Sequence, residues 1–129
     1  MAVRRITNGG RKIIGKFPSI KMGRAVWWES QIERDFIYYP EMDPGVIAFK
    51  EQPLKIRYLL DGKIHSYTPD FLLERADRKQ IVEVKDEKAA ASEEFNLLFR
   101  CVAPICKANG YEYLVITDRE IRRQPRKKG

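Results

Sequence analysis

Two short apolar segments that carry charged side chains constrain the fold of this chain more than any other feature. The first is Tyr67–Leu73, which contains Asp70, and the second, after a polar turn, is Ile81–Lys85. Successive side chains of a β-strand point to opposite faces, so Glu83 and Lys85 share one face while the valines beside them point into a core. The pattern predicts two strands on which Asp70, Glu83 and Lys85 converge at one edge of a sheet.

Such a cluster destabilises a fold unless something neutralises it. Two ionised carboxylates a few ångströms apart repel each other, and burial adds to the cost, unless a cation or a shared proton relieves it. Carboxylate oxygens suit Mg²⁺, with Mn²⁺ as a substitute, and both ions also bind phosphate oxygens. A nearby lysine can then orient or deprotonate an attacking water. The alternative is an exposed ion pair between Glu83 and Lys85, which the spacing alone leaves open.

The net charge of +7 is unevenly spread along the chain. Residues 1–24 carry seven Lys and Arg and no acid, and residues 119–129 carry six against Glu120. Since the chain has 25 Lys and Arg and 18 Asp and Glu in all, residues 25–118 hold 12 bases and 17 acids. An acidic central region between basic ends suits an enzyme whose central region binds a metal and whose ends bind a polyanion. Alternatively, the basic ends could only increase solubility or bind RNA adventitiously. The candidate DNA-binding side chains at the ends are Arg4, Arg5, Arg11, Lys12, Arg122, Arg123, Arg126, Lys127 and Lys128.

The first predicted helix spans roughly residues 30–39 and ends at Pro40. Ser30 followed by Glu33 is typical of a capping box, in which Ser30 accepts from a free backbone N–H and Glu33 reaches back to the Ser30 amide. Capping is therefore one interpretation of Glu33. The only histidine, His65, cannot complete a zinc site with the two cysteines, so we expect it at the surface.

The remaining elements predict an α/β fold. Strands are expected over residues 52–60 and 63–73, joined by an Asp61-Gly62 hairpin turn, and a third strand ends at Lys85, which makes an antiparallel meander. A helix over 89–109, kinked or split near 101–103 by Pro104, leads to a strand over 111–117. Because a helical crossover joins parallel strands, this last strand should give a mixed sheet flanked by helices.

In these segments the chain resembles the PD-(D/E)XK nuclease superfamily, and more closely the catalytic domain of TnsA, the endonuclease subunit of heteromeric transposases. The resemblance covers about residues 27–118. It rests on five segments in the family's order: Glu29–Phe36, Asp43–Val46, Glu51–Pro53, Tyr67–Phe71 and Val82–Lys85. It implies a restriction-endonuclease-like core, and it divides the chain into a basic arm (1–24), a nuclease domain (25–118) and a basic tail (119–129).

The resemblance also implies roles for individual residues. Glu33 would be a third active-site carboxylate, Asp70 and Glu83 metal ligands, and Lys85 the catalytic lysine. The Val84 backbone carbonyl would bind metal as well. TnsA has Gln where Glu83 stands here, so this chain is closer to the wider superfamily at that position. Gln52 matches the family's Gln-Pro element, where it could touch DNA or position Glu33, or instead satisfy backbone groups at the start of a strand.

The expected activity is Mg²⁺-dependent endonucleolytic hydrolysis of DNA. The chain ends in basic residues rather than in the family's further domain for its transposition regulator, so we expect a stand-alone nuclease of a mobile element or bacteriophage. It would act in transposition, recombination or DNA packaging, with a transposase or phage protein as a candidate partner. No run of ~18 apolar residues or secretion signal is found, so a cytoplasmic protein without a membrane partner is expected. The alternative is a non-catalytic DNA-binding or structural protein on the same fold, such as a component of a phage particle.

Overall fold

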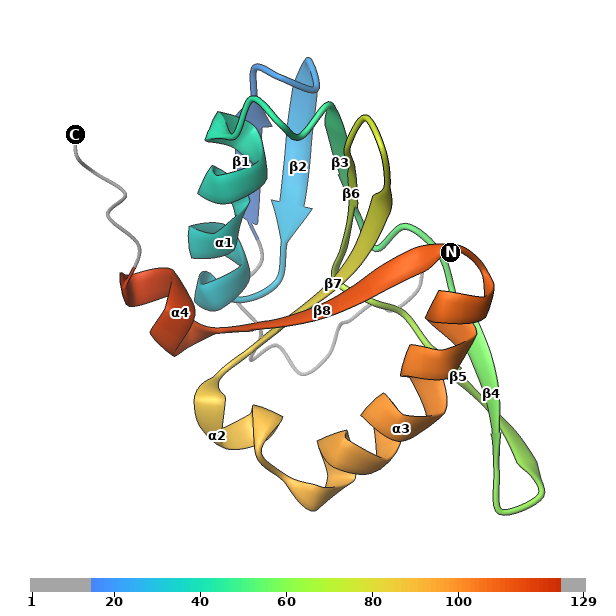
Figure 1. Cartoon of the computed structure of the whole chain (residues 1–129). Helices are drawn as coiled ribbons and strands as arrows, with labels where there is room; N and C mark the ends of the chain where they lie inside the picture. The colour runs from blue at the N-terminus through green and yellow to red at the C-terminus, as the bar shows by residue number, and fades with distance from the viewer. Residues whose placement is uncertain (1–14, 124–129) are drawn as a thin grey trace.

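A four-stranded mixed sheet forms the centre of the protein (Figure 1). The computed structural model describes residues 15–123. The sheet has the order β3-β6-β7-β8, and only the β7–β8 pair is parallel. Its strands are β3 (Ala48–Glu51), β6 (Phe71–Glu74), β7 (Lys79–Lys85) and β8 (Tyr111–Thr117). The predicted α/β fold with a mixed sheet is therefore confirmed, and so is the parallel final strand.

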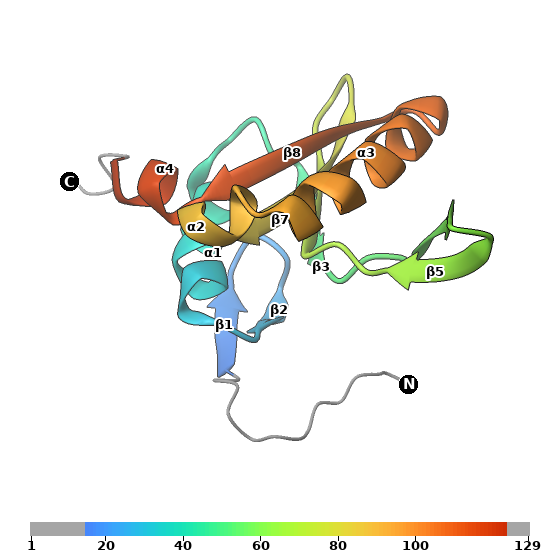
Figure 2. The same cartoon turned by 90° about the horizontal axis from the view of Figure 1, so that it is seen from below.

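Helices cover both faces of this sheet. The first face packs against α1 (Gln31–Met42), and its core includes Phe36, Phe71 and Val82. The second face packs against α3 (Glu93–Ala108), with Ile81 and Val102 among its buried residues. Two short helices complete the set, α2 (Glu87–Ala90) and α4 (Asp118–Arg123). Figures 1 and 2 show α1 and α3 on opposite sides of β7 and β8.

Two hairpins lie outside the central sheet, and each forms its own two-stranded sheet. The first joins β1 (Gly15–Ser19) to β2 (Arg24–Trp28) and lies against α1. The second joins β4 (Ile56–Leu60) to β5 (Lys63–Tyr67) and projects beside α3 (Figure 2). Its turn residues Asp61 and Gly62 have φ values of 53° and 75°, as a type I′ turn requires, so the predicted hairpin is confirmed.

The predicted strands are interrupted where the chain carries proline. The strand expected over 52–60 starts only at Ile56, because Gln52 has a left-handed φ of 43° and Pro53 follows it. The strand expected over 63–73 is broken between Tyr67 and Phe71, around Pro69. Proline has no N–H to donate to a strand ladder, so both strands stop beside it. The expected meander is thus divided between two sheets, and β3 pairs with β6 in place of β4.

The helix boundaries also differ from the prediction at both helical prolines. Pro40 lies inside α1, which continues to Met42, and the Lys21 ammonium donates to the Pro40 carbonyl at 2.7 Å. Pro104 lies inside α3, which is continuous from Glu93 to Ala108. The break occurs instead before α3, where the Ser92 hydroxyl caps the helix by accepting from the Phe95 amide at 3.1 Å. In this protein side-chain caps, rather than prolines, set the helix ends. Within residues 15–123 no helix is long and apolar enough to cross a membrane.

The carboxylate of Glu41 ties the β1–β2 turn to the end of α1. It accepts hydrogen bonds from the Ser19 hydroxyl at 2.5 Å and from the Ile20 and Lys21 amides at 2.9 and 3.1 Å. Although burial opposes the charge, these three donors leave the pKa of Glu41 below its ordinary value. A group with a depressed folded-state pKa stabilises the fold above its unfolded pKa, and that contribution is lost as the pH falls through the depressed value.

We therefore expect Glu41→Gln to lower the free energy of unfolding by about 1 kcal/mol at pH 7, because an amide cannot accept from three donors. The loss should shrink as the pH falls below about 4 and through the depressed pKa of the folded carboxyl, where the wild-type side chain also becomes neutral. Urea unfolding at both pH values measures it. The control is Asp77→Asn. The Asp77 side chain is 75% exposed, so this substitution should change stability little. Equal effects of the two substitutions would contradict this role of Glu41.

Candidate active site

Three carboxylates meet at the end of the sheet where β6 begins. Glu33 comes from the first turn of α1, Asp70 from the residue before β6, and Glu83 from the middle of β7. Glu33 and Asp70 line the same cavity, and the charge of Glu83 raises the pKa of both. The Val84 amide donates to the Asp70 carboxylate at 2.7 Å. The structure thus brings together all three acids singled out in the sequence.

Burial and mutual repulsion make this cluster unfavourable when all three acids are ionised. The pKa of Asp70 is raised well above its ordinary value by burial, and then by the charges of Glu83 and Glu33. Burial also raises the pKa values of Glu33 and Glu83. For Glu83 the Tyr67 hydroxyl and the Lys85 ammonium act in the opposite direction. Full ionisation of the three acids is therefore unfavourable, and a shared proton or a bound cation would relieve it.

Glu33 takes part in the cap of α1 and also lies in the acid cluster. Its amide donates to the Ser30 hydroxyl at 3.2 Å, as a helix cap requires. Its carboxylate accepts from the Glu29 amide at 2.8 Å, and not from the Ser30 amide expected for a capping box. The Glu33 and Asp70 side chains line one cavity. The cap therefore orients Glu33 toward the acid cluster, and capping does not compete with a place in the site.

Lys85 lies at the outer edge of the cluster. Its ammonium is 3.2 Å from Glu83 Oε2 and 5.0 Å from the centre of the Phe95 ring. The ion pair considered from the sequence is present, but it is not exposed, since Glu83 is only 7% exposed. A buried pair of this kind costs desolvation energy that a surface pair does not. Glu83 and Lys85 are thus held together by packing of β7 against α3.

Two tyrosines that the sequence analysis did not single out complete the surroundings of Glu83. The Tyr67 hydroxyl donates to Glu83 Oε1, and the Tyr113 hydroxyl is 2.9 Å from that of Tyr67. Burial is the first cause that raises the pKa of both tyrosines, so both hydroxyls keep their protons and can act as donors. Tyr113 could have been found from strand alternation, because it stands opposite Ile81 in the β7–β8 register and shares the face of Glu83.

Gln52 braces the site from the side of β3. Its backbone amide donates to the Asp70 carbonyl at 2.8 Å, and its side-chain amide donates to Glu29 Oε2 at 3.1 Å. The side chain therefore binds a carboxylate rather than backbone groups at the start of a strand. An acidic cavity of about 270 Å³ opens here. It is lined by Trp27, Glu29, Glu33, Glu51, Gln52 and Asp70.

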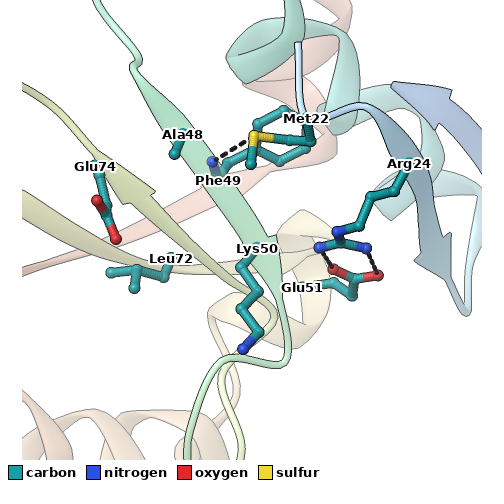
Figure 3. Close-up of a pocket in the computed structure, with 8 residues that line it drawn as sticks. All are labelled: Met22, Arg24, Ala48, Phe49, Lys50, Glu51, Leu72 and Glu74. Atoms are coloured by element: carbon teal, nitrogen blue, oxygen red, sulfur yellow. Dashed lines mark hydrogen bonds and ion pairs between the residues drawn. The ribbon is translucent and has the colours of Figure 1, made fainter. Parts of the chain in front are cut away.

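A larger cavity of about 480 Å³ lies along β3, and Figure 3 shows the residues that line it. Arg24 crosses from β2 and binds Glu51 through two hydrogen bonds of 3.0 and 2.6 Å. The Trp27 amide also donates to Glu51, at 2.8 Å. Glu51 therefore joins the β1–β2 hairpin to β3. None of the three clustered acids lines this cavity, although Glu51 lines both it and the acidic cavity beside the cluster.

The predicted DNA-binding residues are only partly visible. Arg122 is exposed on α4, 3.3 Å from Asp118, and Arg123 ends that helix. The other basic candidates lie outside the described residues, and these are Arg4, Arg5, Arg11, Lys12, Arg126, Lys127 and Lys128. Strand β1 occupies part of the expected arm, and α4 occupies part of the expected tail. His65, expected at the surface, is half-buried and stacks on Tyr58 with ring centres 5.3 Å apart.

The raised pKa of Asp70 gives a test of the electrostatics. An acid with a raised folded-state pKa costs stability once the pH exceeds its unfolded pKa of about 4, and the cost grows up to the raised value. Asp70→Asn removes this cost and keeps an acceptor for the Val84 amide. In EDTA at pH 7.5 we expect the variant to melt at least about 3 °C above the wild type, with the gap closing near pH 4. Thermal unfolding measures this, and a lower melting temperature at pH 7.5 would contradict it.

Comparison with known proteins supports a relationship through the same segment. Residues 43–118 match the family described as TnsA-like endonuclease N terminal. A search of curated proteins finds no match. The matched segment contains Asp70, Glu83 and Lys85, while Glu33 lies before it. Because the match spans more than half of the chain, this protein belongs to the TnsA-like endonuclease N-terminal family.

Proposed function

We propose that this protein is a metal-dependent endonuclease that hydrolyses phosphodiester bonds in DNA. The observation that carries the proposal is the grouping of the partly buried Asp70 and the buried Glu83 with Lys85, whose ammonium is 3.2 Å from Glu83. Acids with raised pKa values beside a lysine are characteristic of functional sites rather than of structural ion pairs. The family supports the same reaction class, since it is a family of endonucleases.

The chemistry of the acid cluster fits a hard divalent cation. Among residues 15–123 no group of three His, Cys, Asp or Glu side chains would by itself hold a metal ion. An ion here would therefore depend on Asp70 and Glu83, assisted by Glu33, the Val84 carbonyl, and water or phosphate oxygens. This incomplete protein coordination suits Mg²⁺, which keeps several waters, and Mn²⁺ can replace it. When bound, the cation would activate water and stabilise negative charge on the phosphate.

The protein's own residues hold the reacting groups in place. Tyr67 donates to one oxygen of Glu83 and Lys85 contacts the other, so the carboxylate cannot rotate freely. The Val84 amide fixes Asp70 in the same way. Lys85 is the group placed to orient the attacking water and to offset charge in the transition state. In-line attack would then leave a 5′-phosphate, as expected for the superfamily.

The substrate and partners follow from charge and family. The basic ends would hold the DNA backbone while the acidic body presents the site. TnsA-like domains work with a transposase, so transposition is the first candidate process, and recombination or phage DNA packaging is the second. Gln52 would act mainly as a brace for Asp70 and Glu29, given its two hydrogen bonds to these residues.

The activity can be tested by nicking of supercoiled plasmid. We expect cleavage in Mg²⁺ or Mn²⁺, none in EDTA, and a loss of at least about 100-fold for Asp70→Ala or Lys85→Ala, because each removes a charge that acts in the transition state. The matched controls are Asp77→Ala and Lys79→Ala, at exposed residues away from the site. Unchanged cleavage by either site variant would refute the mechanism. Salt-sensitive, chelator-independent binding without any nicking would instead support the non-catalytic DNA-binding alternative.

The basic tail can be tested separately. Ile121 of α4 is 3% exposed and belongs to the core, so a deletion must begin after Arg123 to leave the fold intact. Replacing Arg126, Lys127 and Lys128 with Gln should weaken DNA binding and reduce its salt slope by up to about 3, since each phosphate contact contributes about 0.9. Fluorescence anisotropy from 50 to 300 mM salt measures the slope. An unchanged slope would mean that the tail does not contact DNA.

A further inference from the structure

We propose that a cavity between the β4–β5 hairpin and α3 binds one unpaired nucleobase of the DNA, next to the phosphate that is cleaved. The proposal rests on the proposed function and adds a substrate class, DNA with an unpaired base near the cleavage point. It concerns the face of the sheet opposite to α1. Figures 1 and 2 show that the hairpin and α3 lie on the same side of the molecule.

The cavity has a volume of about 430 Å³, which is ample for a base and part of its sugar. Its walls come from the hairpin, the end of β7, and the helices α2 and α3 with the turn between them. The lining residues central to the argument are Tyr58, Leu60, His65, Lys85, Phe95 and Leu98. Half of the lining residues are apolar and the rest carry polar groups, and such a mixture is typical of sites that bind small ligands.

The hairpin presents a ready-made stacking surface to this cavity. Tyr58 and His65 stand opposite each other in the β4–β5 register, and their rings are stacked with an angle of 17° between the planes. Both side chains are half-buried, so part of each ring remains accessible. Nucleobases stack on such rings with little dependence on sequence. A surface of this kind suits a non-specific base contact.

Lys85 connects this cavity to the acid cluster. It lines the cavity, yet its ammonium is 3.2 Å from Glu83 and 5.0 Å from the centre of the Phe95 ring. A phosphate bound at the cluster would therefore lie beside the opening of the cavity. A base is joined to its phosphate through a single sugar. The base of the nucleotide next to the bound phosphate can therefore enter the cavity.

Charge favours this cavity over the one on the other side of the cluster. The 270 Å³ cavity has two further acids, Glu29 and Glu51, beside the cluster acids Glu33 and Asp70, and no Lys or Arg among residues 15–123 lines it, so it offers no positive charge to a strand that continues past the bound phosphate. The cavity beside α3 has Glu94 as its only acid among the residues that line it, and this is balanced by Lys85. A strand that leaves the cluster should thus follow the α3 side.

A paired base cannot enter this cavity, because it is stacked and hydrogen-bonded inside the duplex. Extrusion costs least where the base has no partner. The protein should therefore bind a duplex with a single unpaired nucleotide more tightly than a fully paired duplex. This increase in affinity should depend on the base itself and not on the distortion of the backbone. An abasic nucleotide at the same position should therefore not increase the affinity.

The test is fluorescence anisotropy with three duplexes in EDTA, where no cleavage occurs: fully paired, with one unpaired nucleotide, and with that nucleotide abasic. We expect about tenfold tighter binding of the unpaired-base duplex than of the other two. Leu60→Trp, which fills the cavity, and His65→Ala, which removes part of the stacking surface, should reduce the difference below about threefold. Leu59→Trp is the matched control, since the 65% exposed Leu59 lies on the opposite face of the same hairpin.

Equal affinity of the wild type for the unpaired-base and abasic duplexes would overturn the proposal, as would an undiminished preference in Leu60→Trp. Thermal unfolding of each variant verifies that the hairpin change leaves the fold intact, and His65→Ala provides a second variant that introduces no bulk. The outcome is independent of the nicking assay. Nicking without base discrimination would refute only this inference, whereas base discrimination without nicking would refute only the catalytic proposal.

Discussion

The hydrogen bond from the Val84 amide to the Asp70 carboxylate joins the two strands on which the rest of the site depends. It is 2.7 Å long and lies where β6 begins beside β7. From this point the side chains of β7 alternate, with Val82 and Val84 in the core against α1 and Glu83 on the face toward α3. One short strand therefore supplies core packing on one face and an acid of the cluster on the other.

The acid cluster lowers the stability of the fold when its carboxyl groups are ionised. Glu33, Asp70 and Glu83 all have raised pKa values, with burial as the leading cause. The surrounding structure offsets only part of the cost, through the Tyr67 hydroxyl, the Val84 amide and the Lys85 ammonium. Acids kept close together in this way destabilise the fold when they are ionised. The β1–β2 hairpin and α1 provide the compensating packing on the first face of the sheet.

Local patterns predicted those elements whose signals lie within a few residues. The Asp61-Gly62 turn has the two positive φ values that its sequence indicates, and β7 alternates as expected. Proline gave misleading signals in helices, since Pro40 and Pro104 are tolerated inside α1 and α3. The prediction underestimated the effect of proline in strands. Pro53 and Pro69 each interrupt an expected strand, and as a result the strand pairing is divided between two sheets. Propensity alone cannot settle such cases, because distant groups also bind the helix, as the Lys21 ammonium does at the Pro40 carbonyl near the end of α1.

The sequence by itself determined the family and the mixed α/β fold, and it predicted that Glu33, Asp70, Glu83 and Lys85 lie together, because motif order and strand alternation are local properties. Only the tertiary structure decided what surrounds them. Tyr113 is far from Glu83 along the chain, yet the parallel β7–β8 pairing brings it to Tyr67 and so into the network around Glu83. The cavity beside Lys85 likewise arises from the meeting of the β4–β5 hairpin with α3. Such contacts depend on packing between distant segments, and no local pattern encodes them.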